Sequence, residues 1–148
     1  MNMLKVIEKI RARVLLADDH PAVIESLRAV VEPEFEVVAT VGDGNALVAA
    51  VETLDPDVIV TDLSMPGLNG IAAAARILGS NPAARIVFVT VHNQPEMMEK
   101  CLAIGALGYV LKLRAGDDLV PAIHAVLRGQ RHLSPALGKE PSSSTGGR

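Results

Sequence analysis

The sequence has 148 residues and a net charge of −3, which fits one domain with an extension. The negative charge argues against a nucleic-acid-binding surface. The single cysteine, Cys101, excludes an internal disulfide and a cysteine metal cluster, and it is expected to pack in the core. No apolar stretch is long enough for a signal peptide or a membrane span, so a soluble cytoplasmic protein without membrane contacts is expected.

Five short apolar runs alternate with five helical patterns along the chain. The apolar runs predict strands ending at Ala17, Val41, Thr61, Thr90 and Leu111. The helical patterns predict helices over residues 20–31, 45–54, 70–78, 95–104 and 117–127. Pro21 fits the first position of its helix, whereas Pro121 either requires the last helix to start late or kinks its first turns. Residues 42–44 (GDG) lack the spacing of a nucleotide-binding loop and predict a plain turn.

This alternation predicts an α/β fold, a doubly wound parallel sheet with helices on both faces. We expect an N-terminal extension over residues 1–12, a folded domain over residues 13–137, and a flexible tail or linker over residues 138–148, where Gly, Pro, Ser and Thr predominate. Functional residues in such sheets gather at the carboxyl ends of the strands.

Polar residues end or directly follow four of the five predicted strands. They are Asp18 and Asp19, then Asp62, Thr90 and Lys112. Two carboxylates about 4 Å apart repel by roughly 4 kcal/mol at an effective dielectric near 20, so three of them require a bound cation or a retained proton. Oxygen ligands suit Mg²⁺, while a lysine ammonium and a threonine hydroxyl can hold a phosphoryl oxygen. The set therefore predicts phosphoryl transfer.

Each of these residues also has a simpler interpretation when it is taken alone. Asp18 or Asp19 could cap the helix that follows, and Thr90 or Lys112 could be a surface group. The combination of residues, and no single one of them, favours a functional site. None of the four histidines is expected to bind a metal ion: His20, His92, His124 and His132.

Three segments resemble the response-regulator receiver domains of two-component systems. Residues 61–70 (TDLSMPGLNG) resemble the phosphoacceptor loop, and residues 108–112 (GYVLK) resemble the strand that carries an aromatic residue and a lysine. Residues 16–21 (LADDHP) resemble the acidic pair in the form common to the NarL/FixJ-type branch. The resemblance covers about residues 13–135. It implies a flavodoxin-like receiver fold with a five-stranded sheet of order 2-1-3-4-5 and five helices.

The resemblance also implies a phosphoacceptor and a metal site. Asp62 would be the phosphorylated aspartate. Mg²⁺ would be bound by the side chains of Asp19 and Asp62 and by the backbone carbonyl of Ser64, with Asp18 acting mainly through water.

The remaining roles implied by the resemblance concern the phosphoryl group and the response to it. Thr90 and Lys112 would hold the phosphoryl oxygens and assist Asp62. Tyr109 would turn inward when Thr90 moves. Ser64 and His92 stand where the family varies the side chains that tune dephosphorylation.

Two positions depart from the family pattern. Val91 is bulkier than the alanine often found after the switch threonine, and we expect it to restrict the inward movement of Tyr109. Pro121 disturbs the start of the last helix, where many family members pair with a partner. A homodimer is therefore left as an open alternative.

The function implied is a phosphorylation-activated switch and not an enzyme, with self-catalysed phosphoryl uptake from a sensor histidine kinase and self-catalysed hydrolysis. One alternative is a degenerate receiver that binds partners without phosphorylation. An aspartyl-phosphate phosphatase is disfavoured, because it needs an Asp-x-Asp pair where this chain has Asp18 and Asp19 side by side. Residues 132–135 (HLSP) and the polar tail resemble the start of a linker in the NarL/FixJ-type branch. We therefore expect the receiver part of a transcription regulator that binds DNA through a separate helix-turn-helix domain, with a stand-alone receiver as the alternative.

Overall fold

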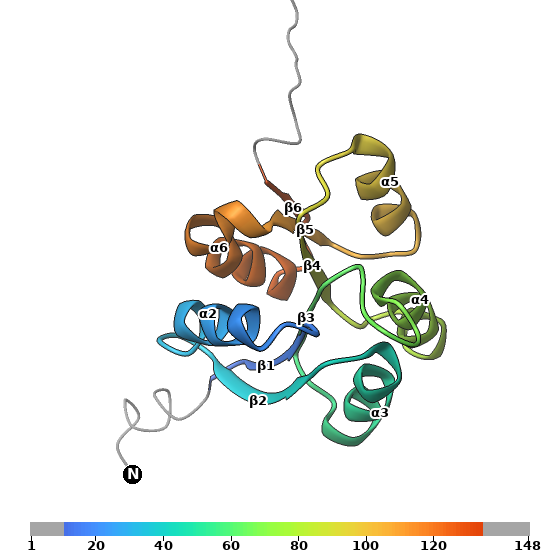
Figure 1. The fold of residues 1–148 in the computed structure, drawn as a ribbon, viewed down its shortest axis with the longest axis horizontal. Coiled ribbons are helices and arrows are strands. Elements are labelled where there is room, and N and C mark those ends of the chain that lie inside the picture. The colour runs from blue at the N-terminus through green and yellow to red at the C-terminus, as the bar shows by residue number, and fades with distance from the viewer. Residues whose placement is uncertain (1–10, 135–148) are drawn as a thin grey trace, which may run out of the picture.

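The computed structural model describes residues 11–134, so most of the expected N-terminal extension and all of the expected tail lie outside the described residues. A parallel six-stranded sheet of order β2-β1-β3-β4-β5-β6 forms the centre of the domain (Figure 1). Its strands are β1 (Arg13–Ala17), β2 (Glu36–Val41), β3 (Val58–Thr61), β4 (Ile86–Thr90), β5 (Gly108–Leu111) and β6 (His132–Leu133). The helices are α2 (Pro21–Val31), α3 (Gly44–Leu54), α4 (Gly70–Ser80), α5 (Pro95–Ala103) and α6 (Ala115–Leu127), and a 3-10 turn, η1 (Lys112–Arg114), precedes α6.

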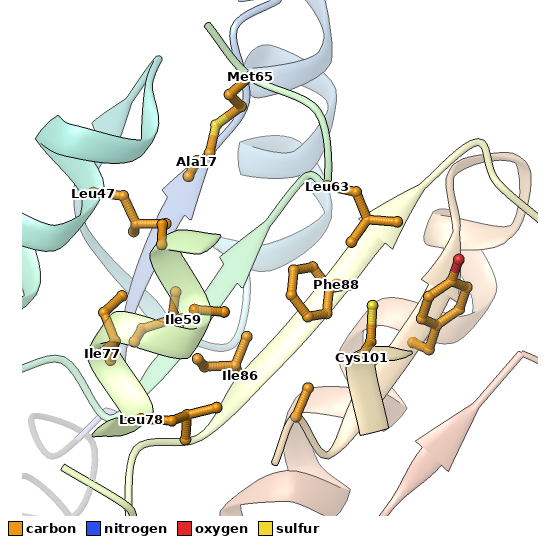
Figure 2. Packing of buried hydrophobic residues seen from close by; sticks show 14 of the residues in the cluster. Ala17, Leu47, Ile59, Leu63, Met65, Ile77, Leu78, Ile86, Phe88 and Cys101 are labelled. Atoms are coloured by element: carbon orange, nitrogen blue, oxygen red, sulfur yellow. The ribbon is translucent and has the colours of Figure 1, made fainter. Parts of the chain in front are cut away.

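Helices cover both faces of the sheet, as the sequence predicts. Because successive side chains of a strand point to opposite faces, Leu15 and Ala17 of β1 pack toward α3, α4 and α5, whereas Val14 and Leu16 pack toward α2 and α6. Figure 2 shows the first of these two cores, where Phe88 of β4 lies among aliphatic side chains. None of the helices within residues 11–134 combines the length and the apolar character needed to cross a lipid bilayer.

Local signals in the sequence explain where several helices begin. Pro21 and Pro95 occupy first-turn positions in α2 and α5, where a missing N–H costs nothing. The Asp43 side chain accepts a hydrogen bond from the Ala46 backbone at the start of α3. Asn69 caps α4 in the same way. Residues 42 and 43 therefore form a bend and a helix cap, and Gly44 already begins α3, one residue before the expected start.

The last part of the domain differs from the sequence-based expectation in two ways. First, β6 adds a sixth strand beside β5, with the pairs Gly108↔His132 and Tyr109↔Leu133. Two residues are too few to produce an alternating pattern, so the sequence carried no signal for this strand.

Second, α6 begins at Ala115, slightly before the expected start near Asp117, and continues through Pro121, which excludes a start after the proline. Pro121 removes the helical hydrogen bond to the carbonyl of Asp117. Because both residues are exposed, water can bond to that carbonyl, and packing of the apolar face of α6 outweighs the loss.

Candidate functional site

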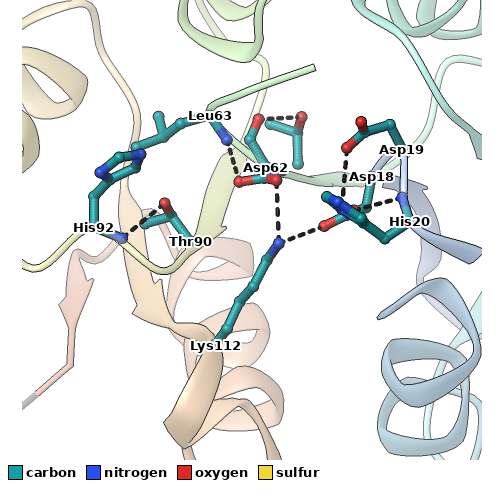
Figure 3. Close-up of polar contacts among 9 residues, drawn as sticks. Asp18, Asp19, His20, Asp62, Leu63, Thr90, His92 and Lys112 are labelled. Atoms are coloured by element: carbon teal, nitrogen blue, oxygen red, sulfur yellow. Dashed lines mark hydrogen bonds and ion pairs between the residues drawn. The ribbon is translucent and has the colours of Figure 1, made fainter. Parts of the chain in front are cut away.

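The polar residues predicted to converge at the carboxyl ends of the strands lie on one edge of the sheet (Figure 3). Asp18 and Asp19 follow β1, Asp62 follows β3, Thr90 ends β4, and Lys112 follows β5. Since β1, β3, β4 and β5 are neighbours in a parallel sheet, the order of the strands alone brings these residues together.

Lys112 is the central charged group of this edge. Its Nζ lies 2.9 Å from Oδ2 of Asp18 and 3.1 Å from Oδ2 of Asp62. Burial by itself would lower the pKa of Lys112, but hydrogen bonds and charge from the two carboxylates outweigh burial and raise it. The ammonium thus neutralises part of the negative charge of the site.

Asp18 is almost completely buried, with 3% of its surface exposed. Its Oδ1 accepts a hydrogen bond from the backbone N–H of His20 and lies 2.9 Å from the Nδ1 atom of the same residue. Burial would raise the pKa of Asp18, but Lys112 and then His20 outweigh it, so the pKa lies below its usual value. Asp18 is therefore a charged structural anchor of the site as well as a candidate ligand.

A divalent cation fits the donor atoms of this edge. Single ligand atoms of Asp18, Asp19, His20 and Asp62 all lie within 4.8 Å of one another. Three carboxylates are the oxygen donors that Mg²⁺ prefers, and their mutual repulsion favours a cation between them. His20 Nδ1, which is also 3.1 Å from Asp19 Oδ1, was not expected in this cluster. Its position directly after the acidic pair in the sequence was the available signal.

Asp62 sits on a tightly packed loop. Its Oδ1 accepts a 2.7 Å hydrogen bond from the backbone N–H of Leu63, which leaves Oδ2 facing Lys112. Gly70 begins α4 directly behind the loop, where a Cβ atom would lie 1.9 Å from the carbonyl oxygen of Asp62. Close backbone packing therefore holds the loop in place.

Solvent reaches Asp62 through an open cavity of about 500 Å³. The cavity is bordered by acidic residues, by Lys112 and by part of the loop after β3, and its lining comprises Asp19, His20, Asp62, Ser64, Met65, Pro66, Val91, His92 and Lys112. A larger cavity of about 630 Å³ lies between α4 and α5, but it lacks the acidic residues. We place the site in the smaller cavity, because the charged groups converge there.

Tyr109 is already buried in this structure, with 0% of its surface exposed. Its hydroxyl donates a 2.9 Å hydrogen bond to the carbonyl oxygen of His92, and the N–H of His92 donates to Oγ1 of buried Thr90 at 3.1 Å. Val91 is 72% exposed, because its side chain alternates with that of Thr90 and faces solvent. The expectation that Val91 restricts an inward Tyr109 was therefore wrong.

Sequence reasoning missed a second polar cluster beneath Lys112. Arg114, Asp118 and Ser134 are joined by hydrogen bonds, and both Asp118 and Ser134 are buried. An acidic residue in the first turn of a helix is a common surface feature, so nothing in the sequence marked Asp118 for burial.

Cys101 is buried as predicted, and burial raises the pKa of its thiol to about 11.

The model of the response regulator receiver domain family matches residues 14–124. The nitrate/nitrite response regulator protein NarL of Escherichia coli is 36% identical over 128 residues, which cover 85% of this chain and 59% of NarL. The transcriptional regulatory protein DegU of Brevibacillus brevis is 33% identical over 129 residues, which cover 86% of this chain and 55% of DegU. The chain thus spans little more than half the length of these relatives.

Solved structures of receiver domains match closely as well. A LuxR-family two-component response regulator from an Aurantimonas species matches with a TM-score of 0.84 and 38% identity, over 88% of this chain and 95% of that one. The isolated REC domain of RcsB from Salmonella enterica serovar Typhimurium, in the presence of the phosphomimetic BeF₃⁻, matches with a TM-score of 0.80 and 32% identity, over 86% of this chain and 96% of that one. The strand order, the acidic edge with its lysine and these similarities lead to one conclusion: the chain belongs to the response-regulator receiver domains, in the branch of NarL and the LuxR-type regulators.

Proposed function

We propose that this chain is a phosphorylation-activated switch in which Asp62 accepts a phosphoryl group from a sensor histidine kinase. The observation that carries this proposal is the contact of one ammonium, Lys112 Nζ, with the carboxylates that follow two different strands, Asp18 and Asp62, beside an open cavity. An oxygen of Asp62 would bond to phosphorus while the bond between phosphorus and the donor nitrogen breaks. Lys112 can then exchange its contact with Asp62 for one with a phosphoryl oxygen.

Mg²⁺ is the cofactor that we assign to this site. Asp19 and Asp62 would hold it with the backbone carbonyl of Ser64, and Asp18 would act mainly through water. When bound, the ion would neutralise charge that develops on the phosphoryl oxygens. Asp19 is the most accessible of the three carboxylates, with 30% of its side chain exposed, which suits a ligand that must meet an incoming ion.

Thr90, Tyr109 and His92 are the residues that we assign to the response. A phosphoryl group adds about −1.5 to −2 charges at neutral pH, which can draw the Thr90 hydroxyl away from the N–H of His92. The Tyr109 hydroxyl donates a hydrogen bond to the carbonyl of the same His92. Tyr109 would therefore respond to the movement of Thr90 without first moving inward. Ser64 and His92 border the cavity, where their side chains would affect the access of water during dephosphorylation.

For the whole protein, we propose the receiver part of a transcription regulator. NarL and DegU are longer than the matched region, and a solved RcsB structure is described as an RcsB–DNA complex. A separate domain would contact DNA. We also propose a second copy of this chain as a partner, which would form a homodimer. We also place the protein in the cytoplasm.

Intact-mass spectrometry after incubation with Mg²⁺ and acetyl phosphate tests the phosphoacceptor. We expect the mass of one phosphoryl group to be added to the wild type and to the control Asp43→Asn, because asparagine also caps a helix. Asp62→Asn should gain nothing. A gain that survives in Asp62→Asn would falsify the assignment, and no gain in the wild type would favour a degenerate receiver.

A further inference from the structure

The backbone that carries Lys112 depends on a residue beyond the five-stranded unit. Strand β6 pairs with Gly108 and Tyr109 of β5 but stops before it reaches Leu111. The N–H of Leu111 therefore has no backbone acceptor in β6, and it donates instead to Oγ of Ser134 at 3.0 Å. Ser134 therefore completes the hydrogen bonding of β5 immediately before Lys112.

The hydroxyl of Ser134 is fixed in orientation by a second hydrogen bond. It donates its proton to Oδ2 of Asp118 at 2.9 Å, which leaves its lone pairs free to accept from the N–H of Leu111. Ser134 is 1% exposed, and its own N–H donates to the carbonyl of Tyr109. The position of this hydroxyl is thus determined by backbone and side-chain contacts together.

Asp118 connects the same hydroxyl to the far end of η1. Its carboxylate accepts from Nε of Arg114 at 2.9 Å and from a second nitrogen of that guanidinium at 3.3 Å. Burial would raise the pKa of Asp118, but Arg114 and Ser134 outweigh it, so the carboxylate stays charged. Because η1 runs from Lys112 to Arg114, this cluster contacts the backbone N–H immediately before the turn and the side chain of the last residue of the turn.

We propose that Ser134 and Asp118 are positioning residues for Lys112. They hold the backbone at Leu111 and the side chain of Arg114, on either side of Lys112, and the long side chain of Lys112 reaches Asp18 and Asp62 from between these two contacts. The proposal rests on the proposed function, in which Lys112 holds a phosphoryl oxygen. It also assigns part of the phosphoryl site to Ser134, which lies beyond residues 14–124 matched by the family model.

Two readouts on matched variants test the proposal. The first is the NMR signal of the Lys112 ε-methylene group at constant pH, without metal or phosphoryl mimic. The second is the affinity for BeF₃⁻ with Mg²⁺, followed by ¹⁹F NMR. The variants are Ser134→Ala, which removes both hydroxyl hydrogen bonds, Ser134→Thr, which retains a hydroxyl, and Leu133→Ala, which weakens the packing of β6 but leaves Ser134 intact.

We expect Ser134→Ala to shift the Lys112 signal and to weaken BeF₃⁻ binding roughly threefold to tenfold, a change on the scale of one net hydrogen bond, because the displaced lysine would hold the mimic less well. Ser134→Thr should restore both readouts. Leu133→Ala should lower the Tm with little effect on either. Asp118→Asn keeps the shape of the side chain but loses the charge that holds Arg114, so it should shift the same signal even if Ser134→Ala does not fold.

The proposal would be overturned if the Lys112 signal were the same in the wild type, Ser134→Ala and Asp118→Asn. It would also be overturned if Ser134→Ala and Leu133→Ala, compared at matched Tm, had equal effects on the Lys112 signal and the BeF₃⁻ affinity. Absence of BeF₃⁻ binding in the wild type would instead contradict the proposed function. In that case the Lys112 signal still decides the positioning role, because it needs no phosphoryl mimic.

Discussion

Nζ of Lys112 lies 3.1 Å from Oδ2 of Asp62, although fifty positions separate the two residues in the sequence. The same nitrogen contacts Asp18, whose pKa is lowered while that of Lys112 is raised. Both groups therefore remain charged around neutral pH. The ammonium compensates part of the charge of the acidic edge, and a cation or a phosphoryl group can change its contacts.

The proposed Mg²⁺ site predicts that Mg²⁺ stabilises the folded protein, because the site would bind the ion in the folded state and not in the unfolded chain. At a concentration of 100 Kd the gain in the free energy of unfolding is about 2.7 kcal/mol. Asp19→Ala should reduce this gain more than Asp18→Ala, because Asp18 already contacts Lys112 and His20. Thermal unfolding with increasing MgCl₂, against NaCl at matched ionic strength, measures the effect. The same Mg²⁺ response in the wild type and both variants would remove the acidic pair from the metal site.

Tyr109→Phe should destabilise the protein by about 1 kcal/mol, the usual net value of one hydrogen bond. The variant removes the donor to the carbonyl of His92 and leaves the buried ring unchanged. Urea unfolding measures the stability. Amide hydrogen exchange over residues 90–94 should also become faster. Unaltered stability and exchange would show that the hydroxyl does not hold this loop in solution.

Asp118→Asn should lower the free energy of unfolding at neutral pH by about 1–3 kcal/mol, because it removes a charge that accepts from Arg114 and Ser134. The folded-state pKa of Asp118 lies below its unfolded value. Its contribution is therefore fully present above the unfolded pKa, which is about 3.9 for aspartate, and is lost as the pH falls through the folded pKa. Urea unfolding between pH 7 and pH 3 should show the gap between wild type and variant narrowing in acid. A gap that stays constant over this range would contradict the ionic role.

Gly70→Ala and Gly79→Ala should have opposite effects, although both positions lie in α4. A Cβ atom at Gly70 would lie 1.9 Å from the carbonyl oxygen of Asp62, so the loop must move and stability must fall. At Gly79 nothing lies within 4 Å, and alanine should add about 0.5–1 kcal/mol through its higher helix propensity. The Tm of each variant gives the comparison. Equal changes in Tm would show that the loop after β3 yields easily to the added methyl group.

The sequence by itself determined the sheet and its charged edge. Apolar runs that end in polar residues give the strands, and parallel strands bring their carboxyl ends to one edge wherever they lie in the chain. The convergence of Asp18, Asp62 and Lys112 follows from this rule together with the order of the strands. That order was implied by the resemblance to receiver domains and did not follow from the apolar pattern alone.

Only the tertiary structure decided the inward position of Tyr109, the pairing of β6 with β5, and the burial of Ser134 against Leu111 and Asp118. Each of these depends on which partner a side chain or a backbone N–H finds among residues distant in the chain. A strand of two residues is too short to show an alternating pattern of apolar and polar side chains. A serine is also the same letter in the sequence whether its hydroxyl is exposed to water or bonds to a buried carboxylate. Tertiary packing determines whether the side chain is buried. A buried polar group needs a hydrogen-bond partner, and the neighbouring sequence does not show which residue provides it.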